Sequence, residues 1–160
     1  MQDFTEHHQE PHPPSETELR TISFAVRSLV SIAERRKGIN AARCRLALLH
    51  SESSALIHRG LRRTLAQHKL SDLQFAILVI LFSTEPEPLS VSVLAEHANV
   101  FRSVLTETLD KLEKARLLTR TRDEFDRRVT YTRITPTGLE TVDHAINDYL
   151  QTAENAVRKL

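Results

Sequence analysis

A short charged segment, residues 123–128, lies between two stretches of alternating residues and restricts this part of the chain to a β-hairpin. In both stretches, residues 118–122 and 129–134, β-branched and polar side chains alternate, as they do in paired antiparallel strands. Two adjacent arginines, Arg127 and Arg128, are expected at the exposed tip, where guanidinium groups suit phosphates or a narrow minor groove. For a motif this short, a solvated loop is the alternative interpretation.

Three helices are expected before this hairpin, in the order typical of a winged helix-turn-helix. Residues 72–82, capped by Ser71, leave almost no polar face and predict a buried core helix. After a proline-containing break, Ser90 caps a short helix that ends at about His97. A third helix is expected over residues 101–115, with one face packed inward. Its opposite face, the candidate reader of base edges, carries Ser103, Glu107, Asp110 and Lys114.

Five linked motifs run through this region: Leu94-Ala95-Glu96, Asn99-Val100-Phe101-Arg102-Ser103-Val104-Leu105-Thr106, Leu112-Glu113-Lys114, Asp126-Arg127-Arg128 and Thr135-Pro136-Thr137-Gly138. In order and spacing they resemble the MarR family of bacterial transcriptional regulators, from residue 71 to about residue 142. The resemblance implies a mainly α fold with a small β-hairpin wing (α+β), in which a winged helix-turn-helix domain joins a helical dimerisation layer built from the N- and C-terminal helices. The chain departs from the family's usual residues at Phe101, Val104, Glu107 and Arg116, which concerns base preference rather than fold.

Long amphipathic helices are expected on both sides of the winged domain. In the last helix, apolar residues alternate at spacings of three and four, a pattern that suits packing against another helix. These residues are Leu139, Val142, Ile146, Tyr149, Ala153, Ala156 and Leu160. Similar alternation follows a capping box at Ser15 and Glu18 and continues until Gly38, and Asn40 caps a third long helix that ends at about Gln67. We expect a second subunit to cover these helices, although helices folded back on their own domain show the same pattern.

The expected organisation therefore has four parts. Residues 1–14 form a disordered acidic tail, and residues 15–70 form the N-terminal helices of the dimerisation layer. Residues 71–135 form the winged helix-turn-helix domain, and residues 136–160 form the C-terminal dimerisation helix. In such a dimer the two recognition helices must stand about 34 Å apart to enter successive major grooves, so the expected operator is a near-palindrome.

The charge distribution agrees with double-stranded DNA as the partner. The net charge is only +1, but residues 1–18 hold five acidic and no basic residues, whereas residues 111–133 hold eight Lys and Arg against four Asp and Glu. The expected DNA-binding residues are Arg102, Ser103, Val104, Thr106, Glu107, Lys111, Arg122, Arg127 and Arg128. Arg127 is expected to enter the minor groove, and the resemblance implies that Asp126 braces Arg128 within the wing.

Regulators of this family usually respond to a small molecule, often an aromatic anion, or to an oxidant. Arg43, His50 and His58 are the candidate crevice residues for such an effector, with solvated side chains as the alternative interpretation. Cys44, flanked by two arginines that favour the thiolate, is the candidate redox residue, although a structural cysteine is the commoner case. No ligand-spacing motif predicts a metal, and no cofactor is expected.

Other classes of protein are disfavoured by composition. The chain has three glycines, no glycine-rich phosphate loop and no nucleophile elbow, so we do not expect an enzyme. No apolar run approaches the roughly 20 residues of a membrane helix and no signal peptide is evident, so a cytoplasmic protein without a membrane partner is expected. The expected function is a homodimeric DNA-binding regulator, more often a repressor in this family. A winged-helix protein-interaction module that has lost DNA binding is the alternative.

Overall fold

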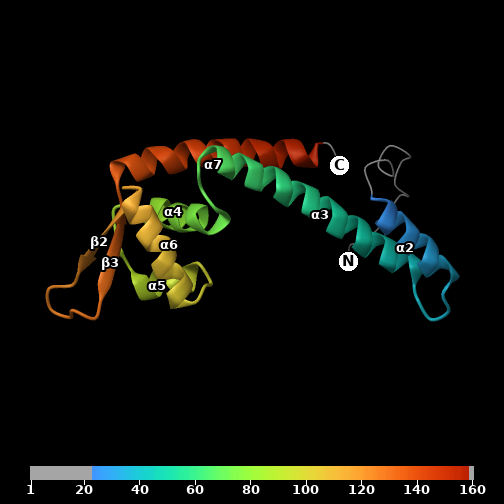
Figure 1. The fold of residues 1–160 in the computed structure, drawn as a ribbon, viewed down its shortest axis with the longest axis horizontal. Helices are drawn as coiled ribbons and strands as arrows, with labels where there is room; N and C mark the ends of the chain where they lie inside the picture. The colour runs from blue at the N-terminus through green and yellow to red at the C-terminus, as the bar shows by residue number, and fades with distance from the viewer. Residues whose placement is uncertain (1–22, 159–160) are drawn as a thin grey trace, which may run out of the picture. The chain divides into compact units, whose positions relative to one another are not determined.

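The computed structural model describes residues 23–158, and these residues divide into two compact units at Ala55 and Leu56 (Figure 1). The N-terminal unit holds α2 (Phe24–Arg35) and the first half of α3 (Ala41–Gln67). The C-terminal unit, here called the winged unit, holds the rest of α3 and all later elements. These are α4 (Asp72–Thr84), β1 (Leu89–Ser90), α5 (Val91–His97), α6 (Arg102–Lys114), β2 (Leu118–Arg122), β3 (Thr130–Ile134) and α7 (Pro136–Val157). The expected acidic tail and the cap at Ser15 lie outside the described residues.

The core of the winged unit is built around α4, as its apolar sequence predicts. A capping box starts the helix: the Ser71 hydroxyl accepts from the Gln74 N–H at 3.3 Å, and the Gln74 side chain accepts from the Ser71 N–H at 2.8 Å. Ile77 and Leu78 are fully buried. The remaining fully buried large side chains, Leu65, Leu81, Leu94, Leu105, Leu109, Leu112, Leu118, Thr132 and Val142, also belong to this unit. Burial on this scale gives the unit a core of its own.

The predicted hairpin is present, and a short strand that the sequence did not predict joins it. β2 and β3 pair from Leu118 opposite Ile134 to Arg122 opposite Thr130. β1 pairs with the other edge of β3, so the antiparallel sheet has the order β1-β3-β2. β1 is only two residues long, Leu89 and Ser90, too short for an alternating pattern to reveal. The third strand fixes the base of the wing to the chain just before α5.

The helix-turn-helix itself follows the predicted boundaries. The Ser90 hydroxyl accepts from the Val93 N–H and caps α5. Asn99 takes a left-handed conformation (φ 51°) in the turn, which asparagine tolerates better than most residues. On α6, the predicted inward residues Leu105, Leu109 and Leu112 are fully buried. In Figure 1, α6 begins beside α5 and rises toward α7, while the tip of the hairpin points away from α7.

The start of α7 is locked onto the segment between α6 and β2. The Thr135 hydroxyl accepts from the Gly138 N–H at 3.0 Å and donates to the Arg116 carbonyl oxygen at 2.7 Å. Gly138 is required here, because a Cβ at this position would lie 2.0 Å from the Leu117 carbonyl oxygen. The Thr135-Pro136-Thr137-Gly138 motif is therefore a docking point for the helix as well as its start.

The first half of the predicted apolar seam on α7 packs within its own unit, which corrects the expectation of a second subunit there. Val142 is fully buried, and Leu139 and Ile146 pack against the same core. The Tyr149 ring lies 4.9 Å, centroid to centroid, from the Phe75 ring of α4. Ala153 and Ala156 are half-buried, and Leu160 lies outside the described residues. Heptad spacing identifies an apolar face but not its partner, which is why the sequence misassigned these residues.

The C-terminal parts of α3 and α7 are also joined by polar contacts inside the winged unit. The hydroxyls of Thr64 and Thr152 are 2.8 Å apart, and His68 Nε2 lies 2.8 Å from a carboxylate oxygen of Asp148. Leu61 and Leu65 are buried beside them on α3. The last two turns of α3 therefore belong to the folded winged unit.

The N-terminal unit is a helical hairpin, and its first helix begins later than predicted. Ser23 is the N-cap of α2 and has extended backbone geometry, so one helix cannot run from Ser15 to Gly38. The Glu52 carboxylate of α3 accepts from the N–H and the hydroxyl of Ser23, which holds this cap in place. Gly38 (φ 81°) makes the predicted turn, and the Asn40 side chain accepts from the Arg43 N–H, as expected of a cap.

No single helix in residues 23–158 is long and apolar enough to cross a membrane. Taken together, α3 and α4 meet the requirements of length and composition, but the chain bends by 74° between them.

Candidate nucleic-acid interface

One face of α6 stays outside the core and presents polar side chains to solvent. The predicted DNA-contacting residues Arg102, Ser103, Val104, Thr106 and Glu107 are all exposed. Leu105, Thr108 and Leu109, which alternate with them along the helix, are buried. The Thr106 hydroxyl donates to the Arg102 carbonyl oxygen at 2.8 Å, so its lone pairs remain available to accept from a base. The face is therefore accessible along the first two turns of α6.

Glu107, which the sequence left as an unusual residue for a DNA-reading helix, forms an ion pair with Lys111. The Lys111 Nζ lies 2.7 Å from a Glu107 carboxylate oxygen, one helical turn away. The hydrogen bond and the positive charge of Lys111 lower the pKa of Glu107 below its usual value. Each side chain therefore reduces the charge that the other presents to a phosphate.

The tip of the wing is organised by two aspartates that bind backbone N–H groups. The Asp123 carboxylate accepts from the N–H groups of Phe125 (2.8 Å) and Asp126 (2.7 Å). The Asp126 carboxylate accepts from the Arg128 N–H at 3.0 Å. The implied brace between Asp126 and Arg128 is thus present, but it holds the backbone and not the guanidinium. Within residues 23–158, no ion pair involves the side chain of Arg127 or Arg128.

Arg120 is a structural residue, which the count of basic residues near the wing did not reveal. Its guanidinium pairs with Asp110 and Glu113, and its backbone N–H donates to Glu113 at 3.1 Å, so β2 is tied to α6. The side chain is only 24% exposed, and hydrogen bonding to Glu113 raises the pKa of Arg120 further. Asp110, expected on the base-reading face, instead serves this tether. A carboxylate three or four residues before the end of α6, facing an arginine on β2, was the available signal.

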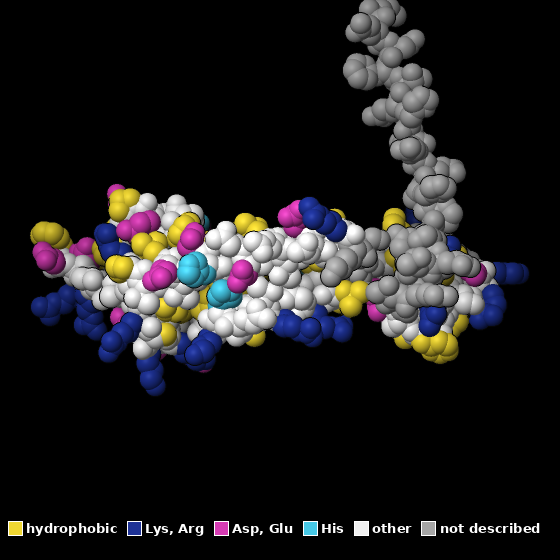
Figure 2. Space-filling view, turned by 90° about the horizontal axis from the view of Figure 1, so that it is seen from above, with side chains coloured by type: hydrophobic (Ala, Val, Ile, Leu, Met, Phe, Trp, Pro, Cys, Tyr) yellow, Lys and Arg dark blue, Asp and Glu magenta, His cyan; other side chains and the backbone are white. Residues whose placement is uncertain are grey.

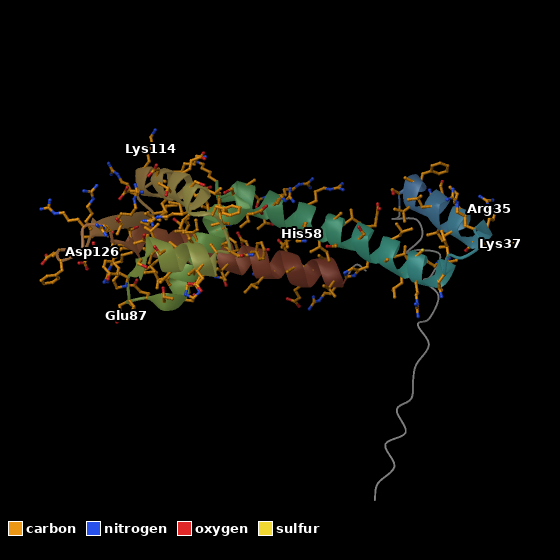
Figure 3. All side chains as sticks on the ribbon, turned by 90° about the horizontal axis from the view of Figure 1, so that it is seen from below. Arg35, Lys37, His58, Glu87, Lys114 and Asp126 are labelled. Atoms are coloured by element: carbon orange, nitrogen blue, oxygen red, sulfur yellow. The ribbon has the colours of Figure 1, made fainter. Side chains whose placement is uncertain are left out.

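The remaining basic side chains collect at the wing-bearing end of the winged unit. Figure 2 shows Lys and Arg side chains grouped along one edge there, with acidic groups more scattered. In Figure 3, Lys114 projects from α6 into solvent, and Asp126 marks the wing. Arg122, Arg127 and Arg128 are exposed on the wing, and Arg102 is exposed at the start of α6. The structure therefore brings the predicted wing and helix residues to one unit.

The candidate effector residues are less well supported by the described part of the chain. Arg43 and His50 are exposed in the N-terminal unit, whereas His58, labelled in Figure 3, is exposed in the winged unit. Cys44 is a half-buried free thiol. Among residues 23–158, no group of three His, Cys, Asp or Glu side chains is placed to hold a metal ion.

A groove that the sequence did not predict lies between α2 and α3 in the N-terminal unit. Its volume is about 250 Å³. Apolar side chains of Val26, Val30 and Leu49 line it together with the charged groups of Arg27, Glu34 and Arg45. None of the three candidate effector residues is among its lining residues. Their role therefore stays a prediction.

Comparisons with known proteins agree with this arrangement. Residues 70–130 match the MarR family model. The HTH-type transcriptional regulator PecS of Dickeya dadantii is 31% identical over 102 residues, which cover 63% of this chain and 61% of PecS. The chain thus matches less than two thirds of that relative. The HTH-type transcriptional regulator MhqR of Bacillus subtilis is 27% identical over 66% of this chain and 71% of MhqR.

Solved structures share the fold. AbsC, a MarR family transcriptional regulator from Streptomyces coelicolor, has a TM-score of 0.66 and 26% identity, over 76% of this chain and 81% of AbsC. Staphylococcus aureus MepR has a TM-score of 0.64 over 71% of this chain and 83% of MepR, and at 18% identity it supports the fold alone. The family match, the two curated relatives and AbsC lead to the same assignment: this chain belongs to the MarR family of transcriptional regulators.

Proposed function

We propose that this protein is a homodimeric, sequence-specific DNA-binding regulator that recognises a near-palindromic operator. One observation carries the proposal: the exposed face of α6 and the unpaired arginines of the wing belong to the same folded unit. A recognition helix suits the major groove, whereas basic wing residues suit phosphates and the minor groove. MepR of similar fold was solved in complex with DNA, which supports the same partner here. A regulator of this kind acts in the cytoplasm.

The α6 side chains divide into base-reading and phosphate-binding groups. Ser103 and Thr106 have hydroxyls that suit base edges, and the exposed Val104 suits a thymine methyl group. Arg102 at the start of the helix suits guanine or a phosphate. Lys111 contributes less to phosphate binding than a free lysine, because Glu107 pairs with it. On the wing, Arg122, Arg127 and Arg128 supply the sequence-independent part of the affinity.

Dimerisation is supported by apolar side chains that have no partner within their own unit. In the N-terminal unit these exposed residues are Phe24, Leu29, Ile32, Ile39 and Leu46. Leu150 and Val157, on the second half of α7, are likewise 60% and 65% exposed. Exposed apolar patches of this kind mark interaction surfaces. A second copy of the chain is the proposed cover, and the two-fold symmetry of such a dimer explains the near-palindromic operator.

We further propose that the protein acts as a repressor and that a small organic anion releases it from DNA. The groove between α2 and α3 places Arg27 and Arg45 beside Val26, Val30 and Leu49, a combination that suits a carboxylate on a small apolar body. Its volume of about 250 Å³ restricts the ligand to roughly one ring. Salicylate, used as a probe, is expected to weaken operator binding by the wild type but not by Arg45→Ala. Equal responses of both proteins would place the effector elsewhere.

Selection of binding sites from random duplex DNA tests the proposed function. Repeated rounds at moderate salt are expected to enrich a near-palindrome that the purified protein binds in a gel shift. Ser103→Ala is expected to relax the base preference at one position of each half-site by about 1–3 kcal/mol, with binding retained. A promoter carrying the selected site is expected to be silenced by the wild type in a reporter assay. Activation of that promoter would overturn the repressor assignment.

A protein-interaction module that has lost DNA binding is the second candidate, and exposed apolar side chains on α6 favour it. Phe101 is 84% exposed and Val104 is 45% exposed, at positions where a DNA-reading helix is usually polar. The same selection separates the two candidates. Failure to enrich any site at low salt, where electrostatic binding is strongest, would support the interaction module.

A further inference from the structure

The most exposed large apolar side chain of the described residues lies at the tip of the wing. Phe125 is 98% exposed, so it makes almost no contact with the rest of the protein. A phenyl ring left in water costs free energy that burial against a partner recovers. The hairpin strands end at Arg122 and Thr130, so the ring belongs to the loop beyond the last paired residues. Its position is therefore the outer end of the element that a winged helix directs at DNA.

The loop that carries Phe125 is held in one conformation by hydrogen bonds. Asp123 binds the N–H of Phe125 itself, at 2.8 Å, and the N–H of Asp126. The Asp123 N–H donates to the Val129 carbonyl oxygen at 3.0 Å, and the Val129 N–H donates to the Asp126 carbonyl oxygen at 2.9 Å. These bonds close the loop across its base. A ring presented by a preorganised backbone loses little conformational entropy when it binds.

The charges around the ring suit a position between two phosphate backbones. Arg127 and Arg128 follow Phe125 directly and are exposed, without ion pairs in the part of the chain that the structure describes. The carboxylates of Asp123 and Asp126 are occupied with backbone N–H groups, which partly offsets their repulsion of phosphates. Glu124 is exposed and opposes close approach to a backbone. The arginines therefore favour the two strands, while the ring is left to the floor of the groove.

From this geometry we infer that Phe125 acts as an apolar wedge, which enters the minor groove of the operator and partly unstacks one base step. Proteins that bind the minor groove insert Phe, Leu or similar side chains between base pairs and kink the duplex. Unstacking is least costly at pyrimidine–purine steps, so the wedge also selects sequence where no hydrogen bond reads a base. Each copy of the dimer places one wedge at an outer flank of its half-site. The inference rests on the proposed function, because it needs a DNA duplex as partner.

The experiment uses the full-length protein and the duplex obtained by selection. Hydroxyl-radical footprinting locates the minor-groove segment that the wing protects, and 2-aminopurine is placed at the pyrimidine–purine step within it. The fluorescence of this base rises when it is unstacked, so the wild type is expected to increase the signal. Phe125→Ala is expected to abolish the increase and to weaken binding about 5- to 150-fold, the range that aromatic stacking on bases provides. Phe125→Leu, which keeps a wedge, is expected to retain most of both.

Two comparisons assign the effect to the ring. Phe101→Ala removes the other exposed aromatic of this unit, on α6, and is expected to leave the 2-aminopurine signal unchanged. The dependence of affinity on salt is expected to keep its slope in Phe125→Ala, because a neutral side chain releases no counterions. In Arg127→Ala the slope is expected to fall by roughly 0.9.

The outcomes separate the wedge from the proposed function. A wild type that binds no duplex would overturn both. If the wild type binds, but Phe125→Ala matches it in affinity and in 2-aminopurine signal, the wedge is wrong and the proposed function stands. Loss of affinity in Phe125→Ala without any 2-aminopurine signal in the wild type would also overturn the wedge, since the ring then contacts the backbone or a second protein.

Discussion

The winged unit and the N-terminal hairpin are built from similar amphipathic helices, yet they differ sharply in what they bury. All fully buried large side chains lie in residues 56–158. Among residues 23–55, only Ala33 is buried, and Phe24, Leu29, Ile32, Ile39 and Leu46 remain exposed. A single buried alanine contributes far less than the roughly 1.5–3 kcal/mol of one buried leucine or valine, so the hairpin has almost no core.

This difference separates two sources of order. The winged unit has the buried surface to fold by itself, whereas the hairpin is ordered locally by helix caps such as Ser23, Asn40 and the turn at Gly38. Caps contribute about 1 kcal/mol each, which does not replace a core. The hairpin therefore needs a second surface, and the proposed dimer provides it. The predictions below test this division, beginning with the largest expected effect.

Gly138→Ala is expected to unfold the winged unit or to destabilise it by about 4 kcal/mol or more. The new Cβ would overlap the Leu117 carbonyl oxygen and press on Ile134, and neither neighbour is free to move. Gly60→Ala is the matched control, because its Cβ would meet only Thr152 at an ordinary 3.7 Å. In the middle of α3 that change is expected to stabilise by roughly 0.5–1 kcal/mol. Urea denaturation of both variants would contradict the account if their order were reversed.

Leu46→Asp is expected to separate the copies and to weaken operator binding by about tenfold or more, while the winged unit stays folded. Leu46 is 63% exposed on the hairpin, so a charge there harms only a surface that the partner covers. Ser51→Asp places the same charge on an exposed polar position of α3 and is expected to leave the copies associated. Sedimentation velocity measures both variants. A Leu46→Asp protein that sediments like the wild type would remove the hairpin from the dimer interface.

Arg120→Ala and Arg127→Ala are expected to separate stability from DNA binding within the winged unit. Arg120 ties β2 to Asp110 and Glu113, so its loss is expected to cost about 1–3 kcal/mol of folding free energy and to leave the salt slope unchanged. Arg127 makes no ion pair in residues 23–158, so its loss is expected to leave stability unchanged and to lower the slope by roughly 0.9. Thermal denaturation and salt titrations give both quantities. An unchanged slope for Arg127→Ala would exclude it from phosphate binding.

Glu107→Gln is expected to have the smallest effect, a rise of up to roughly 0.9 in the salt slope as Lys111 becomes available to phosphate. The direction follows from pH as well. Because Lys111 lowers the pKa of Glu107, the stabilising pair is complete above the usual carboxyl value of 4.5 and is lost as pH falls through the lower, folded-state pKa. At neutral pH the pair is therefore intact in the wild type. A slope identical to that of the wild type would mean that Lys111 does not approach DNA even when unpaired.

Much of the winged unit could be predicted, because local chemistry and burial point to the same structure there. Ser71, Ser90 and Thr135 cap helices where expected, and the hairpin pairs over the predicted residues. The leucine face of α6 is buried as its spacing indicates. Membership of the MarR family, first indicated by motif order, is confirmed by the comparisons.

The errors arose where a pattern fixes a face but not its partner. The seam on α7 was assigned to a second subunit, yet Val142 and Tyr149 pack within the same unit. Arg120 was counted as a basic residue of the wing, because a sequence does not reveal that Asp110 and Glu113 lie across from it. Phe125 was treated as part of a charged tip, and only its exposure singled it out. The DNA-contacting roles of the α6 and wing residues remain predictions.

The composition of the protein–operator complex tests the central claim most directly. Sedimentation of the full-length protein with the selected duplex measures how many chains bind each site, and footprinting of the same complex locates the half-sites. The account predicts two chains per duplex, with half-sites centred about 10–10.5 base pairs apart or a multiple of that distance. One chain per duplex on a site without two-fold symmetry would contradict it.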